Sequence, residues 1–307
     1  MQHAPTEGAA VADLWAECPD EARQAAERVV GSPANWQLMR RGSHGTAKWR
    51  VSGPGTQQVV VKAGAGQAAD VVAREITVLA YMQSAGITAT GYGDAQGLTS
   101  DYTAWLVRPW LTGLTTWSAF QAVRDGHPDV ADYKRALTAA VDLCTAVGGL
   151  HQHGWVHGDL QPHHSVHMAG TRTVQLLGCT WAWAPELAPS SAYTGGLVHL
   201  VAPEVAAAAE SPTRPVITSK SGDVYALAAS LWWSATGDWP VNYAAAAIDP
   251  TAHTAAVLRR MIAARRLRIS TTSVWPQLTE LLREVLTADA VQRPTAFQLA
   301  QSLRRLM

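Results

Sequence analysis

The segment from Trp155 to Ala182, WVHGDLQPHHSVHMAGTRTVQLLGCTWA, carries the side chain with the clearest chemical potential, the carboxylate of Asp159. A polar turn with His157, Gly158 and Asp159 follows an apolar helical stretch and precedes two strand-like stretches, SVHM and TVQLL. Gly170 supplies the flexible position between them, so a tight hairpin is expected. A carboxylate on such a loop can accept a proton from a hydroxyl group. The alternative is an aspartate that only caps the loop.

Histidines crowd the start of this segment and the residues just before it, since residues 151–167 contain His151, His153, His157, His163, His164 and His167. Imidazole suits manganese or zinc, so His163, His164 and His167 could converge on a transition metal if the loop is distorted. Successive residues of a strand point to opposite faces, so a bulge would be needed to align His164 with His167. A metal cluster therefore remains an alternative.

Gly42 and Gly45 lie between two predicted strands, in a turn that contains RGSH. Glycines allow backbone to approach a phosphate closely, with free amides pointing inward. A plain hairpin turn is the alternative interpretation of these two residues.

The loop HGDLQPHH resembles the HRDLKPxN catalytic loop of protein kinases, and more closely the HGD variant of antibiotic phosphotransferases and of the kinase part of lanthipeptide synthetases. VVVK resembles the VAIK strand of kinases, and this resemblance places Lys62 at the α and β phosphates of a nucleotide. Glu75, thirteen residues later, matches the glutamate that pairs with that lysine. An exposed surface glutamate is the alternative for Glu75.

The resemblance extends to the hinge and to the framework of the larger lobe. DYTAWLVRPWLTG resembles the hinge, where the amide of Leu111 would bind adenine. Arg108 falls at the gatekeeper position, and a buried guanidinium requires either a carboxylate partner or a reshaped pocket. The resemblance also implies that Asp223 bonds the catalytic-loop backbone and that Glu204, in an APE motif, pairs with Arg293.

The sequence departs from the family pattern where a metal would bind. LLGCTWA stands in place of IDFGLA, which puts Gly178 where the magnesium-binding aspartate is expected. His164 replaces the asparagine ligand, and magnesium prefers hard oxygen ligands. Gln161 replaces a lysine that contacts the γ-phosphate. The metal site is therefore degenerate, with His164 as the one tentative ligand.

Helices and strands must hold these residues in place, and the sequence indicates where both occur along the chain. Hydrophobic periodicity and turn residues predict the elements up to residue 153, and the resemblance to kinases implies the helices beyond it. Helices are expected over 10–30, 68–83, 115–123, 129–153 and 219–241, with further helices within 281–303, and strands over 35–40, 46–52, 56–64, 87–94 and 101–113.

Composition limits the function classes. The 307 residues are 48% apolar and 16% charged, which is typical of a folded protein. Equal numbers of basic and acidic residues, 24 of each, argue against nucleic acid or an anionic membrane as the partner. Three widely spaced cysteines, no long apolar run and no visible export signal favour a cytoplasmic protein.

The sequence thus predicts an α+β, bilobal, protein-kinase-like fold with a small β-rich lobe over 1–112 and a larger helical lobe over 113–307. The expected activity is phosphate transfer from ATP, with Mg or Mn, to a Ser or Thr hydroxyl of a peptide. Asp159 would act as base, and Gly42, Gly45, Lys62, Glu75 and Leu111 would bind the nucleotide. The resemblance to lanthipeptide kinases adds a biosynthetic precursor peptide and a partner lyase or complex subunit. The alternative is a pseudokinase that holds or regulates another protein.

Overall fold

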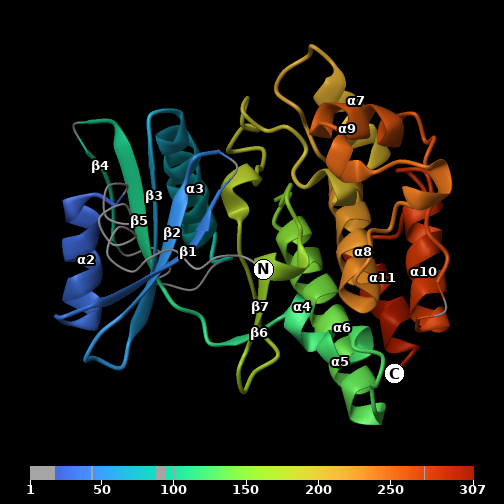
Figure 1. Ribbon diagram of the computed structural model, residues 1–307, viewed down its shortest axis with the longest axis horizontal. Coiled ribbons are helices and arrows are strands. Elements are labelled where there is room, and N and C mark those ends of the chain that lie inside the picture. Colours follow the sequence, from blue (N-terminus) through green and yellow to red (C-terminus); the bar gives the residue numbers. More distant parts are fainter. Residues whose placement is uncertain (1–17, 43, 88–94, 100, 273) are drawn as a thin grey trace. The chain divides into compact units, whose positions relative to one another are not determined.

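The computed structural model describes residues 18–42, 44–87, 95–99, 101–272 and 274–307. It is a mixed α+β structure that divides into two compact units, Met1–Leu111 and Thr112–Met307 (Figure 1). Each unit has its own sheet, one of five strands and one of three.

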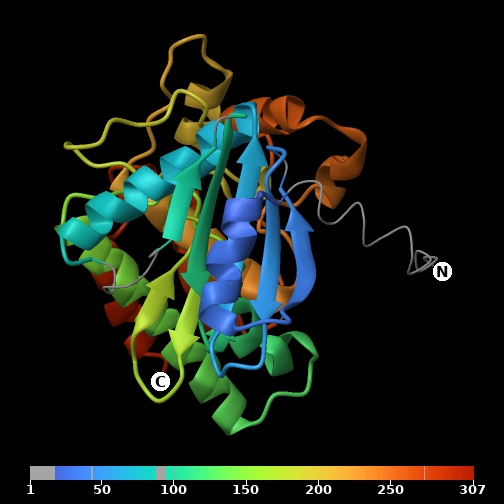
Figure 2. The same ribbon diagram turned by 90° about the vertical axis from the view of Figure 1, so that its left-hand side faces the viewer.

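The first unit is built on an antiparallel five-stranded sheet in the order β1-β2-β3-β5-β4. Helix α2 covers one face, where Trp49, Val61 and Trp105 belong to its apolar core (Figure 2). Helix α3 packs on the opposite face through Val72, against Leu106. The elements are α2 (Asp20–Val30), β1 (Asn35–Arg41), β2 (Ala47–Ser52), β3 (Gln58–Ala65), α3 (Gln67–Ser84), β4 (Ala95–Leu98) and β5 (Thr103–Pro109).

The second unit is mainly helical, with a small sheet in the order β6-β7-β8. The long helix α6 begins with a capping box between Asp129 and Asp132, and α8 ends at Gly237, whose φ is +79°. Its elements are β6 (Gly113–Thr115), α4 (Thr116–Ala119), α5 (Gln121–Arg124), α6 (Val130–Gln152), β7 (Ser165–Met168), β8 (Val174–Leu176), α7 (Pro203–Glu210), α8 (Lys220–Thr236), α9 (Ala255–Ala263), α10 (Pro276–Thr287) and α11 (Ala296–Arg304).

Most predicted elements are confirmed, including the hairpin of β7 and β8, whose turn has Gly170 at φ +73°. The helix predicted over 115–123 is instead two single turns, α4 and α5, preceded by strand β6. At the break, Phe120 has φ −96° and ψ 5°, and the Arg124 side chain donates to the carbonyl oxygen of Trp117. Of the helix predicted over 10–30, the described part is α2, which follows Pro19, while residues 10–17 and nearly all of the strand predicted over 87–94 lie outside the described residues.

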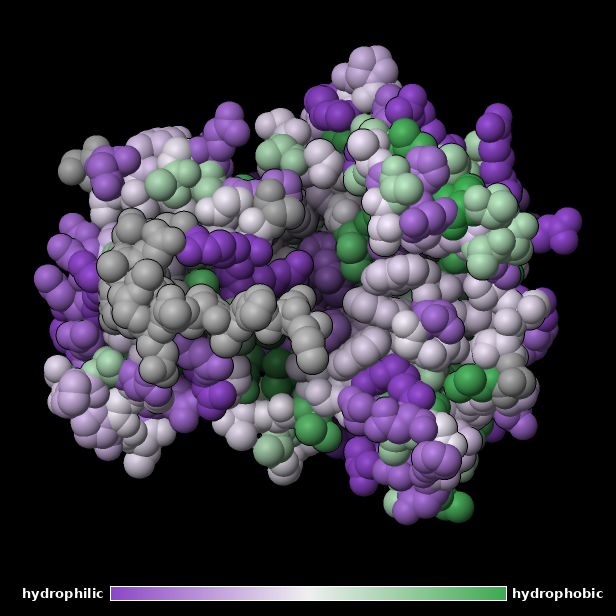
Figure 3. All heavy atoms as spheres, in the orientation of Figure 1, coloured by the Kyte–Doolittle hydropathy of each residue, from purple (hydrophilic) through white to green (hydrophobic). Residues whose placement is uncertain are grey.

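The surface of the visible face mixes hydrophilic and hydrophobic residues, with the hydrophobic ones in small separate patches (Figure 3). Among the described residues, no helix combines the length and the apolar character needed to cross a bilayer. The three cysteines, Cys18, Cys144 and Cys179, are buried and form no disulfide.

Candidate functional site

In the first unit, one buried carboxylate lies between two cations. The Nζ atom of Lys62, on β3, lies 2.5 Å from Oε2 of Glu75, on α3. Nη1 of Arg108, on β5, lies 3.2 Å from the other oxygen, Oε1. The predicted pairing of Lys62 with Glu75 is therefore present. Glu75 is also the carboxylate that the buried Arg108 guanidinium requires.

The charge of Glu75 is fixed by its neighbours. Burial alone would raise the pKa of the Glu75 carboxyl, but Lys62, Arg108 and Lys48 lower it by more, so the net shift is downward. Glu75 is consequently ionised at neutral pH and can orient the Lys62 ammonium. Lys48 on β2 was not among the residues singled out from the sequence.

The prediction that the backbone amides of Gly42 and Gly45 are free to point at a phosphate requires a correction. The Gly42 amide donates to the carbonyl oxygen of Thr46 at 2.6 Å, and the Gly45 amide donates to the carbonyl oxygen of Gly42 at 3.0 Å. Both amides thus close the turn between β1 and β2 and do not point freely toward a phosphate. This is the hairpin-turn alternative. Leu111, the expected adenine-binding residue, is the last residue of the first unit.

In the second unit, Asp223 at the start of α8 fixes the loop that carries Asp159. Its Oδ2 accepts the backbone amide of His157 at 2.7 Å, and its Oδ1 accepts the amide of Gly158 at 2.9 Å. Oδ2 is also 3.0 Å from Nε2 of His151, a buried side chain that sequence reasoning did not assign. The loop is thereby held in the manner that the sequence predicted for Asp223.

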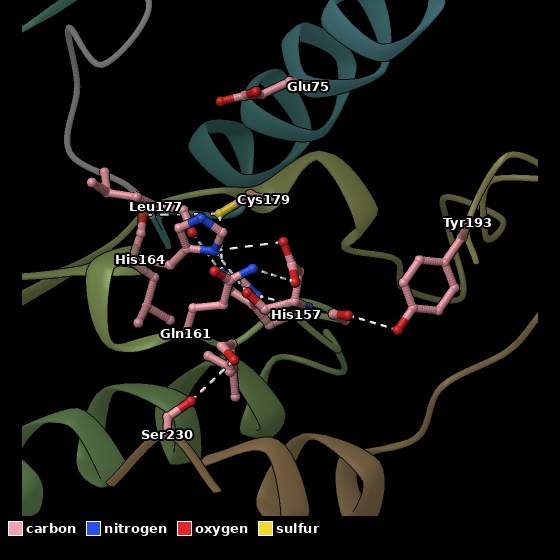
Figure 4. Close-up of polar contacts among 12 residues, drawn as sticks. Glu75, His157, Gln161, His164, Leu177, Cys179, Tyr193 and Ser230 are labelled. Carbon is pink, nitrogen blue, oxygen red and sulfur yellow. Dashed lines mark hydrogen bonds and ion pairs between the residues drawn. The ribbon is translucent and has the colours of Figure 1, made fainter. Parts of the chain in front are cut away.

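His157 is a fully buried histidine inside this loop. Its Nε2 lies 2.9 Å from the carbonyl oxygen of Leu177, and its Nδ1 accepts the backbone amide of Asp159 at 3.2 Å (Figure 4). These contacts define the tautomer with a proton on Nε2 alone. Burial lowers the pKa of His157, which favours the same neutral state. His157 therefore holds the Asp159 backbone in place as a hydrogen-bond acceptor.

The Asp159 carboxylate has close neighbours within its own unit. Gln161 Nε2 donates to Oδ1 at 2.9 Å. The backbone of Gly196 also approaches Oδ1, since a β-carbon on residue 196 would lie 2.7 Å from it. The segment around Gly196 is held by Tyr193, whose hydroxyl donates to the carbonyl oxygen of Gly158 at 2.7 Å (Figure 4). A small pocket beside Asp159 is lined in part by Tyr193 and Asp223.

The expected metal ligands do not fit magnesium. His164 Nδ1 lies 2.8 Å from the backbone oxygen of Asp159 and 3.6 Å from its carboxylate Oδ2. Its imidazole also occupies the space beside Gly178, where a β-carbon would lie 2.6 Å from Nδ1. A hard cation prefers oxygen ligands, and this arrangement presents a ring nitrogen already used in the loop. No step is therefore assigned to a metal at this position.

The histidine cluster considered from the sequence does not form. His163 stacks on Trp117, with ring centroids 5.2 Å apart, and His167 Nε2 bonds Thr116 Oγ1 at 2.9 Å. His164 is directed instead to Asp159. Within the described ranges, no three His, Cys, Asp or Glu side chains are placed to share a metal ion.

The predicted pair between Glu204 and Arg293 is present and bidentate. Nη1 and Nη2 of Arg293 lie 2.5 and 2.9 Å from the two oxygens of Glu204. Nη1 also donates to the carbonyl oxygen of Ser221, next to the start of α8. This pair joins α7 to the helix that carries Asp223, so its role is to support the loop.

Comparison with models of known protein families and with curated proteins finds no match for this chain.

Proposed function

We propose that this chain has a protein-kinase-like fold, with the first unit as the small lobe and the second as the large lobe, and that it is a divergent phosphotransferase. The observation that carries the proposal is the buried ion pair between Lys62 and Glu75. An ammonium held by a carboxylate in this way is suited to bind phosphate oxygens. Glu75 holds that ammonium in place.

Asp159 is the proposed base, which accepts the proton of the acceptor hydroxyl as the γ-phosphoryl group passes from ATP to that oxygen and ADP leaves. Support comes from the loop, because Asp223 fixes its backbone and His157 is held neutral beside the carboxylate. The donor is ATP, and we propose that Lys62 binds its phosphates. The chain's own cations replace part of the charge neutralisation that a divalent metal would otherwise supply.

The proposed acceptor is a Ser or Thr hydroxyl on a peptide in the cytoplasm. The framework of Glu204, Arg293 and Asp223 supports a peptide acceptor because it resembles that of protein kinases more than that of small-molecule kinases. A biosynthetic precursor peptide, processed further by a partner lyase, follows from the resemblance of the HGD loop alone.

A pseudokinase that binds a nucleotide and regulates a protein partner is the second candidate. The observation that favours it is the position of the His164 ring, which fills the space beside Gly178 where a metal ligand would lie. Binding without transfer would be its signature.

The test is phosphate transfer from γ-labelled ATP to a Ser/Thr peptide library, measured with Mg, with Mn and with EDTA. We expect label on peptide that Asp159→Asn abolishes and that Lys62→Ala reduces strongly. Asp238→Asn and Lys134→Ala, which change the same residue types at exposed positions, serve as controls. A thermal shift with ATP that is lost in Lys62→Ala, without any transfer, would establish the pseudokinase. No shift and no transfer would refute both candidates.

A further inference from the structure

The strand register of the first unit places cations side by side on one face of the sheet. Arg40 on β1 is opposite Lys48 on β2, and Lys48 is opposite Lys62 on β3. Paired residues of antiparallel strands share a face, with Cβ atoms about 4.5–5.5 Å apart. Arg40, Lys48 and Lys62 therefore form a row across three strands, on the face that α3 covers.

Arg108 belongs to the same face. Lys62 is opposite Leu106 on β5, and Arg108 is two residues further along that strand, so both side chains point to the α3 side. The ion pair of Arg108 with Glu75, on α3, agrees with this orientation. We call Arg40, Lys48, Lys62 and Arg108 the cationic row.

A bulge in β1 is required to complete the cationic row. Leu38 is opposite Trp49, and the next paired residue is Arg40, opposite Lys48, so Met39 has no partner in the ladder. Simple alternation would put Leu38 and Arg40 on one face. The bulge instead leaves Leu38 on the apolar α2 side and turns Arg40 to the α3 side.

Among the residues that the structure describes, three cations of the row, Lys48, Lys62 and Arg108, act on the same carboxylate, Glu75. Glu75 is the carboxylate that acts on Lys48, while Lys62, Arg108 and Arg40 oppose the charge of its ammonium. Lys48 makes no hydrogen bond or salt bridge of its own within the described part of the chain. Like charges directly opposite each other destabilise a sheet. A face with this excess of positive charge is suited to an anion with several charges.

The protonation of Lys48 is sensitive to its surroundings. Burial lowers the pKa of Lys48 to about 8, and Lys62, Arg108 and Arg40 lower it too, while Glu75 opposes them. Lys48 therefore carries most of its charge at neutral pH and loses it in mildly alkaline solution.

We propose that the cationic row binds a chain of phosphates without a divalent cation, and that Lys48 is a phosphate ligand in this site. The proposal deepens the proposed function, since it rests on Lys62 as a phosphate-binding residue. The Lys48 ammonium, with no partner of its own, gains one in the bound phosphate. The ligand can be the triphosphate of a nucleotide or an inorganic polyphosphate.

The test is calorimetric titration of the full chain with inorganic tripolyphosphate in EDTA, at pH 6.5 and pH 9.5. At each pH, the dissociation constant of Lys48→Met is divided by that of wild type. This ratio removes the effect of the ligand's own protonation, which is the same for both proteins. One charge-assisted contact of about 1.4 kcal/mol corresponds to a factor of about ten. We expect a ratio of about 10 at pH 6.5, which falls to near 1 at pH 9.5. Lys48→Arg should bind about as tightly as wild type at pH 6.5 and keep its advantage over Lys48→Met at pH 9.5.

Arg50→Gln is the matched control, because Arg50 lies on the same strand and face but is already bonded to Gln58. We expect its dissociation constant to stay within twofold of wild type. Equal weakening in Arg50→Gln, an unchanged ratio at the two pH values, or no binding of tripolyphosphate by wild type would each overturn the proposal. Lys48→Met removes a repulsion, so its thermal midpoint should not fall.

Titration with ATP and with adenosine identifies the part of the ligand that is bound. Binding of ATP and tripolyphosphate but not adenosine supports a phosphate-chain site, whereas binding of adenosine alone overturns it. Tripolyphosphate binding does not depend on transfer, so a chain without kinase activity could still confirm this site, and an active kinase could still fail the test.

Discussion

The imidazole of His164 and the missing side chain of Gly178 are one structural feature. A β-carbon at position 178 would lie 2.6 Å from Nδ1 of His164, and Gly178 has a φ of +71°, in the left-handed region. The two departures from the kinase metal motif are therefore coupled, because the ring of one occupies the space that the other leaves. Reversing only one of them should be unfavourable.

We predict that Gly178→Asp alone lowers the free energy of unfolding by roughly 1–3 kcal/mol, through the steric clash and the left-handed backbone. In the double variant with His164→Asn the loss should be smaller by about 1 kcal/mol. Urea denaturation of the wild type, both single variants and the double variant measures this coupling. Additive effects of the two substitutions would show that the residues do not compete for space.

Glu75 should matter more to stability than Lys62. Glu75→Gln leaves Lys62, Arg108 and Lys48 without their shared carboxylate, and the expected loss is roughly 3–5 kcal/mol. Lys62→Met leaves Glu75 with Arg108 as its partner, so the loss should be less than half as large. Chemical denaturation compares the two, with Glu21→Gln at an exposed helix start as control. A larger loss for Lys62→Met would contradict the charge balance described for this site.

Substitution of Glu204 should lower the free energy of unfolding more than substitution of Arg293. The Arg293 side chain is fully buried, whereas 36% of the Glu204 side chain is exposed. Glu204→Ala leaves a buried guanidinium without its carboxylate and should cost roughly 3–5 kcal/mol. Arg293→Met leaves a carboxylate that water can reach and should cost less. Asp289→Ala, which breaks the exposed pair with Arg265, should cost less than about 1 kcal/mol in the same denaturation assay.

His199 should make stability depend on pH. Burial lowers its pKa from the ordinary 6.5 to about 4, and its ring stacks on Trp239. Folding therefore favours the neutral ring, so this contribution is complete above about pH 6.5 and is lost as the pH falls toward 4. The stability difference between wild type and His199→Phe should shift in favour of the variant over that range. In His253→Gln, at an exposed position, the difference from wild type should stay constant; the same shift there would exclude His199 as its source.

Contacts that depend on residue type at a fixed place in a motif could be predicted from the sequence. Lys62 with Glu75, Asp223 with the loop amides, and Glu204 with Arg293 are three such contacts, and all are present. Each joins oppositely charged or complementary groups, and each was implied by the resemblance of its motif to the kinase pattern.

Contacts that depend on register or on filled space could not be predicted. The position of Lys48 opposite Lys62 follows from strand pairing, which alternation alone does not fix. The turn at Gly42 and Gly45 was ambiguous because glycines serve a closed turn and an open phosphate loop equally well. His164 and Gly178 share one space because the segments that carry them pack together in the fold. The number of residues between them in the sequence does not indicate this contact.

The extra residue in β1 has a consequence for how this strand can change over evolution. Met39 separates a first half, Asn35–Leu38, whose apolar side chains serve the core under α2, from a second half that supplies Arg40 to the opposite face. Substitutions before Met39 should alter stability, and those after it should alter affinity. The two properties could then be selected independently within seven consecutive residues.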